Sequence, residues 1–225
     1  MSTGQLPDAE PLPPFNYRLA SVLRQRTDVD LAGSLYAVPP DGRQDIARLL
    51  VRERLWVHAD VFADPAAGVD LGLITELADA GVGPIDVHLL TAEALSALPV
   101  LCRSGIARIT FPFEGVPDIT GIARQVRACG AEAWLAIAPA TTVAEAAEAA
   151  RDVDGLLVML LEPGTQDAAD LGLLAKVQTA RAHAPVGADG GIGEHNLTSV
   201  LRAGAGYVVI GRGLFTGPSA EGDQP

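Results

Sequence analysis

The sequence predicts a single (β/α)8 barrel, an α/β fold, from its length, a repeated helix–strand unit and the composition of its strands. A chain of 225 residues suits one domain of this kind. Amphipathic helical stretches end in a small residue plus glycine, at Gly81, Gly105, Gly130 and Gly204, and then pass into an apolar run. Eight apolar runs of this kind occur along the chain. Eight parallel βα units close into a barrel.

The expected strands are mostly continuous apolar runs without strict alternation, as in parallel strands that are covered on both faces. Glycine suits the end of each preceding helix, because it adopts the left-handed conformation without a Cβ penalty. The strands are expected at residues 31–37, 55–61, 85–90, 106–112, 131–138, 155–161, 185–189 and 207–210.

The two ends of the chain depart from this plan. Residues 16–26 have the pattern of a helix before the first strand, whereas no long helical pattern follows the eighth. We therefore expect the helix around Tyr17–Leu23 to cover the barrel where an eighth outer helix would otherwise lie. Residues 1–15 are predicted to be a disordered Pro-rich tail, residues 16–217 the barrel domain and residues 218–225 a flexible tail.

The amino-acid composition argues against nucleic acid and membranes as binding partners. The 16 Lys and Arg against 28 Asp and Glu give a net charge of -12, which opposes binding to nucleic acid and to anionic membranes. The apolar runs are too short to span a bilayer, and the first residues lack a secretory-signal pattern, so a cytoplasmic location is expected. Cys102 and Cys129 are expected to be buried apolar fillers rather than a disulfide or a metal pair.

Polar residues at the carboxyl ends of three expected strands suggest a metal site, because barrel enzymes build their active sites at that face. His58 and Asp60 lie two apart on one strand, His88 follows Asp86 at the same spacing on the next, and Asp189 ends the seventh. One such histidine alone is more often a hydrogen-bonded core residue. Together, His58, Asp60, His88 and Asp189 suit one divalent ion of Zn, Fe, Mn or Co. His183 and His195 are expected at the surface.

Several segments have the pattern of one known family. They are Ser34-Leu35, Val57-His58-Ala59-Asp60-Val61, Asp86-Val87-His88-Leu89, Leu157-Val158-Met159, Ala188-Asp189-Gly190-Gly191-Ile192 and Gly211-Arg212-Gly213-Leu214-Phe215. The sequence thus resembles a divergent ribulose-phosphate 3-epimerase, from about Ala32 to Phe215. The resemblance implies a barrel of the ribulose-phosphate-binding type that often forms homo-oligomers.

The resemblance also implies a reaction. His58, Asp60, His88 and Asp189 would bind the metal, and the two aspartates would serve as acid and base. They would invert C3 of a phosphorylated ketose, either ribulose 5-phosphate-like or a ketohexose 6-phosphate, through a metal-stabilised enediolate. The residues that would contact the sugar or its phosphate are Ser34, Met159, Gly164, Gly190, Gly191, Gly211 and Arg212.

Other parts of the sequence differ from the family. The phosphate loop Asn-Pro-Gly-Phe-Gly-Gly-Gln is replaced by Glu162-Pro163-Gly164-Thr165-Gln166-Asp167, the loop at Phe62–Gly68 has changed, and Pro112 stands near the place of a family histidine. Arg212 replaces a serine and could bind phosphate, or be a solvated surface arginine. These changes suggest retained chemistry on a different sugar.

Two other functions are consistent with the sequence. A lyase or decarboxylase on the same fold is one, although related decarboxylases have an Asp-x-Lys-x-x-Asp motif and the second strand here has no lysine. A non-catalytic barrel scaffold is the other, and the presence of both acid/base aspartates argues against it.

Overall fold

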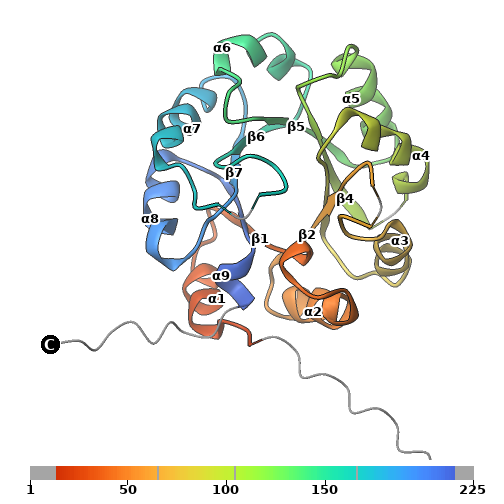
Figure 1. The fold of residues 1–225 in the computed structure, drawn as a ribbon, viewed down its shortest axis with the longest axis vertical. Helices are drawn as coiled ribbons and strands as arrows, with labels where there is room; N and C mark the ends of the chain where they lie inside the picture. The colour runs from red at the N-terminus through yellow and green to blue at the C-terminus, as the bar shows by residue number, and fades with distance from the viewer. Residues whose placement is uncertain (1–13, 65, 104, 166, 216–225) are drawn as a thin grey trace, which may run out of the picture.

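The barrel is the central feature of the computed structural model, which describes residues 14–215 except residues 65, 104 and 166 (Figure 1). Within these residues eight parallel strands close into a barrel in chain order, with the first strand paired to the eighth. They are β1 (Asp30–Ser34), β2 (Trp56–Val61), β3 (Ile85–Leu89), β4 (Ile106–Pro112), β5 (Glu132–Ile137), β6 (Gly155–Met159), β7 (Val186–Asp189) and β8 (Tyr207–Ile210). The predicted (β/α)8 fold is confirmed.

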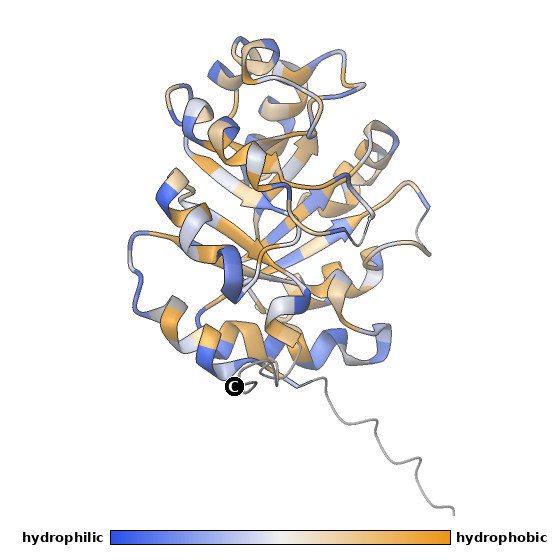
Figure 2. Cartoon of the chain, turned by 60° about the vertical axis from the view of Figure 1, so that its left-hand side comes forward, coloured by the Kyte–Doolittle hydropathy of each residue, from blue (hydrophilic) through white to orange (hydrophobic). Residues whose placement is uncertain are grey.

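Helices surround the strands on the outside of the barrel (Figure 1). They are α2 (Arg43–Arg52), α3 (Leu71–Asp79), α4 (Leu98–Leu101), α5 (Ile119–Ala128), α6 (Val143–Ala146), α7 (Leu174–Ala180) and α8 (Glu194–Ala203). Asp70 and Asp118 begin α3 and α5 by accepting a hydrogen bond from a backbone N–H in the first turn. Hydrophobic residues predominate along the strands, and hydrophilic residues are frequent on the helices and loops around them (Figure 2). No helix in the described residues is long and apolar enough to cross a membrane.

The glycines that end the repeated helical stretches lie where the sequence predicts them. Gly81, Gly105, Gly130 and Gly204 all have positive φ, between +70° and +101°. At Gly105 a Cβ would also lie 2.8 Å from the carbonyl oxygen of Ala78, so both conformation and space require glycine there. The left-handed conformation after each helix, which all four glycines share, therefore underlies the repeat.

The first strand is shorter than predicted, because residues 35–37 form a 3-10 turn instead of continuing it. The side chain of Ser34 accepts a hydrogen bond from the N–H of Tyr36 and thereby caps this turn. The strand ends where the chain enters the mouth of the barrel, and Ser34 is the last residue of β1.

The two cysteines were predicted wrongly. Cys102 follows α4 and Cys129 ends α5, and the two form a disulfide with their Cα atoms 4.9 Å apart. Cys102 is exposed and Cys129 is half-buried, so neither fills the core. The repeat explains the pairing, because successive βα units bring the ends of neighbouring helices together.

The extra N-terminal helix, α1 (Tyr17–Arg24), packs beside α9 (Arg212–Phe215), a single turn that follows β8. The N–H of Asn16 donates to the carbonyl oxygen of Leu214 over 2.8 Å, and the rings of Phe15 and Phe215 lie 6.2 Å apart. Figure 1 shows α1 between α8 and α2, in the ring of outer helices. The predicted extra helix, and the absence of a long helix after β8 up to residue 215, are confirmed. The predicted tails lie almost entirely outside the described residues.

Candidate metal centre and substrate cavity

Four of the predicted residues meet at the mouth of the barrel. Parallel pairing of β2 with β3 sets His58 beside Asp86 and Asp60 beside His88, and β7 brings Asp189 to the same level from the far side. Because side chains alternate along a strand, residues two apart point into the barrel together. One possible ligand atom from each of His58, Asp60, His88 and Asp189 lies within 4.8 Å of all the others.

The cluster alternates nitrogen and oxygen atoms. His58 Nε2 lies 3.2 Å from Asp60 Oδ1 and 3.6 Å from Asp189 Oδ2. His88 Nδ1 lies 3.3 Å and 3.6 Å from the same two oxygens. The histidines are buried, whereas the side chains of Asp60 and Asp189 are 10% and 14% exposed. The two carboxylates therefore form the accessible side of the cluster.

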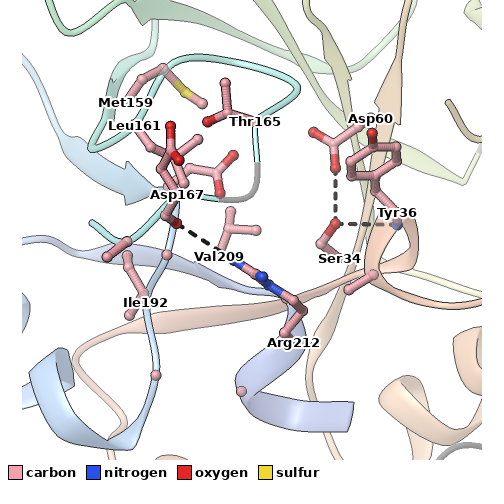
Figure 3. A pocket seen from close by; sticks show the side chains of 18 of the residues that line it. Ser34, Tyr36, Asp60, Met159, Leu161, Thr165, Asp167, Ile192, Val209 and Arg212 are labelled. Atoms are coloured by element: carbon pink, nitrogen blue, oxygen red, sulfur yellow. Dashed lines mark hydrogen bonds between the residues drawn. The ribbon is translucent and has the colours of Figure 1, made fainter. Parts of the chain in front are cut away.

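A cavity of about 960 Å³ opens above these carboxylates, and both aspartates line it. The seven residues predicted to contact the substrate all border it: Ser34, Met159, Gly164, Gly190, Gly191, Gly211 and Arg212. Ser34 Oγ donates to Asp60 Oδ2 over 2.8 Å and so orients that carboxylate (Figure 3). Pro112 is buried at the end of β4 and is not among the residues that line this cavity, so its substitution does not alter the described wall.

The end of the cavity away from β2 is formed by α9 and by the loops after β6 and β7. Arg212 extends from α9 toward the loop after β6, and its Nη2 lies 3.5 Å from the carbonyl oxygen of Asp167 (Figure 3). Gly191 has φ +62°, and a Cβ there would lie 2.4 Å from the backbone nitrogen of Ala169. Only glycine lets these two loops approach so closely.

The two loops that depart from the family pattern meet over the cavity. Phe62, from the loop after β2, lies beside Gly164, from the loop after β6, where a Cβ would be 3.1 Å from the ring. The rings of Phe62 and Tyr36 are 5.5 Å apart. The altered segments therefore form one connected part of the cavity wall. We call the loops after β2 and β6, together with α9, the rim of the cavity.

Comparison with known proteins agrees with this geometry. The family model described as the ribulose-phosphate 3 epimerase family matches residues 31–215. The chain belongs to this family. The ribulose-phosphate 3-epimerase of Mycobacterium leprae is 28% identical over 187 residues, covering 76% of this chain and 84% of that protein. Ribulose-phosphate 3-epimerase 2 of Cupriavidus necator is 32% identical over 151 residues, covering 62% of this chain and 63% of that protein.

Similar solved structures support the fold alone, because their sequence identity is low. A 3-hexulose-6-phosphate synthase matches with TM-score 0.62 at 19% identity, over 81% of this chain and 90% of that one. A mutant tryptophan synthase α-subunit from Pyrococcus furiosus matches with TM-score 0.60 at 17% identity, over 83% and 87%. Both confirm the barrel.

The donor set of this ribulose-phosphate 3-epimerase family member fits a divalent cation. His88 Nδ1 is buried and makes no hydrogen bond, although two carboxylate oxygens face it. A buried polar atom without a hydrogen bond is costly, and a cation among these four atoms would satisfy it. Two imidazole nitrogens and two carboxylates are ligands that several first-row divalent metals accept. Family and cluster together fit a metal-dependent epimerase.

The carboxylates of the cluster counteract the effect of burial on the pKa values of its histidines. Burial by itself lowers the pKa of His58, but attraction to Asp60 and hydrogen bonds to Asp60 and Asp86 raise it well above its ordinary value. Asp189 and Asp60 also raise the pKa of His88, although burial by itself lowers it. Burial opposes ionisation of Asp60, but His58 and His88 hold the pKa of that carboxyl below its usual range. The site thus favours positive charge among its carboxylates.

Sequence reasoning missed several residues near the site. Asn16 and Arg18, around the start of α1, border the cavity, and so does His195, which is exposed as expected. No local pattern marks α1 as part of the cavity, because its place depends on how it packs on α9. Arg108 was also missed, although it lies two residues before Thr110 on β4 and so points into the barrel.

Proposed function

We propose that this chain is an isomerase that inverts C3 of a phosphorylated ketose, either ribulose 5-phosphate-like or a ketohexose 6-phosphate. The observation that carries the proposal is the position of Asp60 and Asp189. They come from β2 and β7, strands that are not neighbours, and both border the cavity next to the same two histidines. Inversion needs an acid and a base on opposite faces of one carbon, and two carboxylates that reach one cavity from separate strands can provide them.

In this mechanism one aspartate removes the C3 proton and the other returns a proton to the opposite face. Ser34 keeps the Oδ2 atom of Asp60 in place by donating to it. Asp60 Oδ1 and Asp189 Oδ2 face both histidines, which hold the two carboxylates in position. A divalent cation bound by His58, Asp60, His88 and Asp189 would supply positive charge beside the substrate oxygens that become negative.

The phosphate of the substrate is proposed to lie at the opposite end of the cavity. Backbone groups at Gly190, Gly191 and Gly211 line that end, and Arg212 offers a planar set of N–H donors. Local donors of this kind are needed because the net charge of -12 repels an anion. Met159 and Gly164 would contact the sugar between the two ends. The altered rim at Phe62 and Thr165 favours a sugar other than ribulose 5-phosphate itself.

Exchange of the C3 proton with solvent tests the proposal. The enzyme is incubated in D2O with D-ribulose 5-phosphate or D-fructose 6-phosphate and with Mn²⁺, Zn²⁺, Fe²⁺ or Co²⁺ in turn, and the sugars are followed by proton NMR. We expect deuterium at C3 and appearance of the C3 epimer for at least one sugar. Absence of exchange with every phosphoketose and free ketose would overturn the proposal.

We also propose that the protein forms a homo-oligomer and lies in the cytoplasm. Light scattering would test the oligomeric state.

A further inference from the structure

A second polar group lies beneath the metal centre, on the side of His58 that faces away from the cavity. It consists of Asp86 on β3, Thr110 on β4 and Tyr207 on β8. All three are buried, and Asp86 has no exposed surface. None of them is among the four residues of the cluster. Buried polar groups inside a barrel need a structural or functional reason, because burial without partners is costly.

Asp86 contacts the ring nitrogen of His58 that is not in the cluster. Its Oδ2 atom lies 3.1 Å from His58 Nδ1 and accepts a hydrogen bond from the hydroxyl of Tyr207 over 2.7 Å. The Tyr207 hydroxyl is itself 3.3 Å from His58 Nδ1. Thr110 donates to the other oxygen, Oδ1, over 3.0 Å. Both carboxylate oxygens of Asp86 thus accept a hydrogen bond, and one of them, Oδ2, also faces His58.

This contact sets the tautomer of His58. An ionised carboxylate only accepts hydrogen bonds, so Nδ1 must carry the proton that it shares with Asp86. In the neutral imidazole Nε2 then carries the lone pair, and it is the atom that faces Asp60 and Asp189. A histidine that binds a metal needs this arrangement, because the coordinating nitrogen must be unprotonated.

A buried cation, Arg108, stacks against the ring of Tyr207. The guanidinium carbon of Arg108 lies 3.8 Å from the ring centre of Trp134 and 4.3 Å from that of Tyr207. Arg108 pairs with Glu132 over 2.8 Å. Its charge adds to the larger effect of His58, which holds the pKa of Asp86 below its usual range against the opposing effect of burial. Polar contacts therefore continue from Arg108 through Tyr207 and Asp86 to His58.

We propose that Asp86 and Tyr207 are positioning residues that fix His58 with its proton on Nδ1 and thereby raise the affinity of the cluster for a divalent cation. This inference rests on the metal centre of the proposed function but not on its substrate. Support of this kind typically changes metal affinity about 10–100-fold. A purely structural network would instead change stability and leave metal affinity unaltered.

Metal titration without substrate tests the inference. Chelated full-length protein is titrated with Co²⁺ and followed by its visible absorption. We expect Asp86→Asn to weaken Co²⁺ binding about 10–100-fold and Tyr207→Phe to weaken it several-fold. Thr110→Val is the matched control, because it removes a buried hydrogen bond from the Asp86 oxygen that does not face His58, and it should have a smaller effect than either. Thermal unfolding of each variant separates metal affinity from stability.

A second measurement reports the tautomer directly. Nitrogen-15 shifts of the His58 ring in the Zn²⁺-loaded protein should show a protonated Nδ1, and Tyr207→Phe should shift that signal. Equal Co²⁺ affinity in wild type and Tyr207→Phe would overturn the inference, even if Asp86→Asn fails to fold. A wild type that binds no Co²⁺ would overturn both this inference and the metal centre. A wild type that binds Co²⁺ but exchanges no C3 proton would overturn the proposed function alone.

Discussion

The four-residue cluster and the rim of the cavity differ in what positions them. Cluster residues are on strands, and the pairing of β2 with β3 sets His58 and Asp60 against Asp86 and His88. Rim residues are on the loops after β2 and β6 and on the short helix α9, where Arg212 is exposed. The cluster retains the family pattern, whereas the rim loops have changed. In a barrel, loops vary while strands hold the chemistry, so reaction and substrate are set by different regions here.

The largest effect should come from an aspartate of the cluster. Asp189→Asn removes an acid/base group and is expected to slow C3 proton exchange by about 10³-fold, within the range for such groups. Deuterium incorporation measured by NMR gives the rate. Asp167→Asn is the matched control on the rim, since Asp167 also borders the cavity, and it should change the rate less than tenfold. Equal losses in the two variants would remove the distinction between cluster and rim.

The spacing of the cluster explains why it was predictable. His58 and Asp60 are two residues apart on a strand, so period-two geometry alone places both in the barrel. The hydrogen bond from Ser34 to Asp60 and the stack of Arg108 on Trp134 could not be predicted, because they join residues of different strands. The Cys102–Cys129 disulfide depended on two helix ends meeting in space. Local periodicity predicted the fold and the convergence of the four cluster residues; packing across strands decided the rest.

In protein from which metal has been removed, the two cluster histidines should make the free energy of unfolding depend on pH. In metal-free protein the pKa values of His58 and His88 are raised above 6.5 by the neighbouring carboxylates. A raised folded-state pKa contributes stability that is complete below pH 6.5 and is lost as pH rises through the folded value. Urea unfolding of chelated protein should therefore show a lower free energy of unfolding at pH 9 than at pH 6.

Added Zn²⁺ should reduce this dependence, because the cation replaces the lost positive charge. His183→Gln is the control, since His183 is exposed and precedes the start of β7, whereas Asp189 lies at the other end of that strand, and it should retain the wild-type fall. A chelated wild type with no fall between pH 6 and pH 9 would contradict the raised histidine pKa values described for the cluster.

A rim substitution should affect substrate binding and spare the chemistry. Arg212→Ala is expected to raise KM for a phosphorylated ketose about 10–100-fold, since hydrogen bonds to charged groups are worth about 1.5–3 kcal/mol. kcat should change by no more than a few-fold, and KM for the unphosphorylated ketose should stay constant. Arg202→Ala, at an exposed position on α8, is the matched control. An equal rise in KM for both sugars would show that Arg212 does not hold phosphate.

The smallest effect should come from the buried side of the N-terminal helix, which packs against the rim helix α9. Leu19 is buried in α1, and α1 contacts α9, the helix that carries Arg212. Leu19→Ala should cost about 2–3 kcal/mol of stability and raise KM for the phosphorylated sugar a few-fold as α9 loosens. Val22→Ala changes an exposed residue of the same helix and should leave both values near wild type. Co²⁺ affinity should stay unchanged in both variants, because the cluster is held by the strands. A loss of Co²⁺ affinity in Leu19→Ala would mean that cluster and rim are coupled through the barrel, and the separation of reaction from substrate would fail.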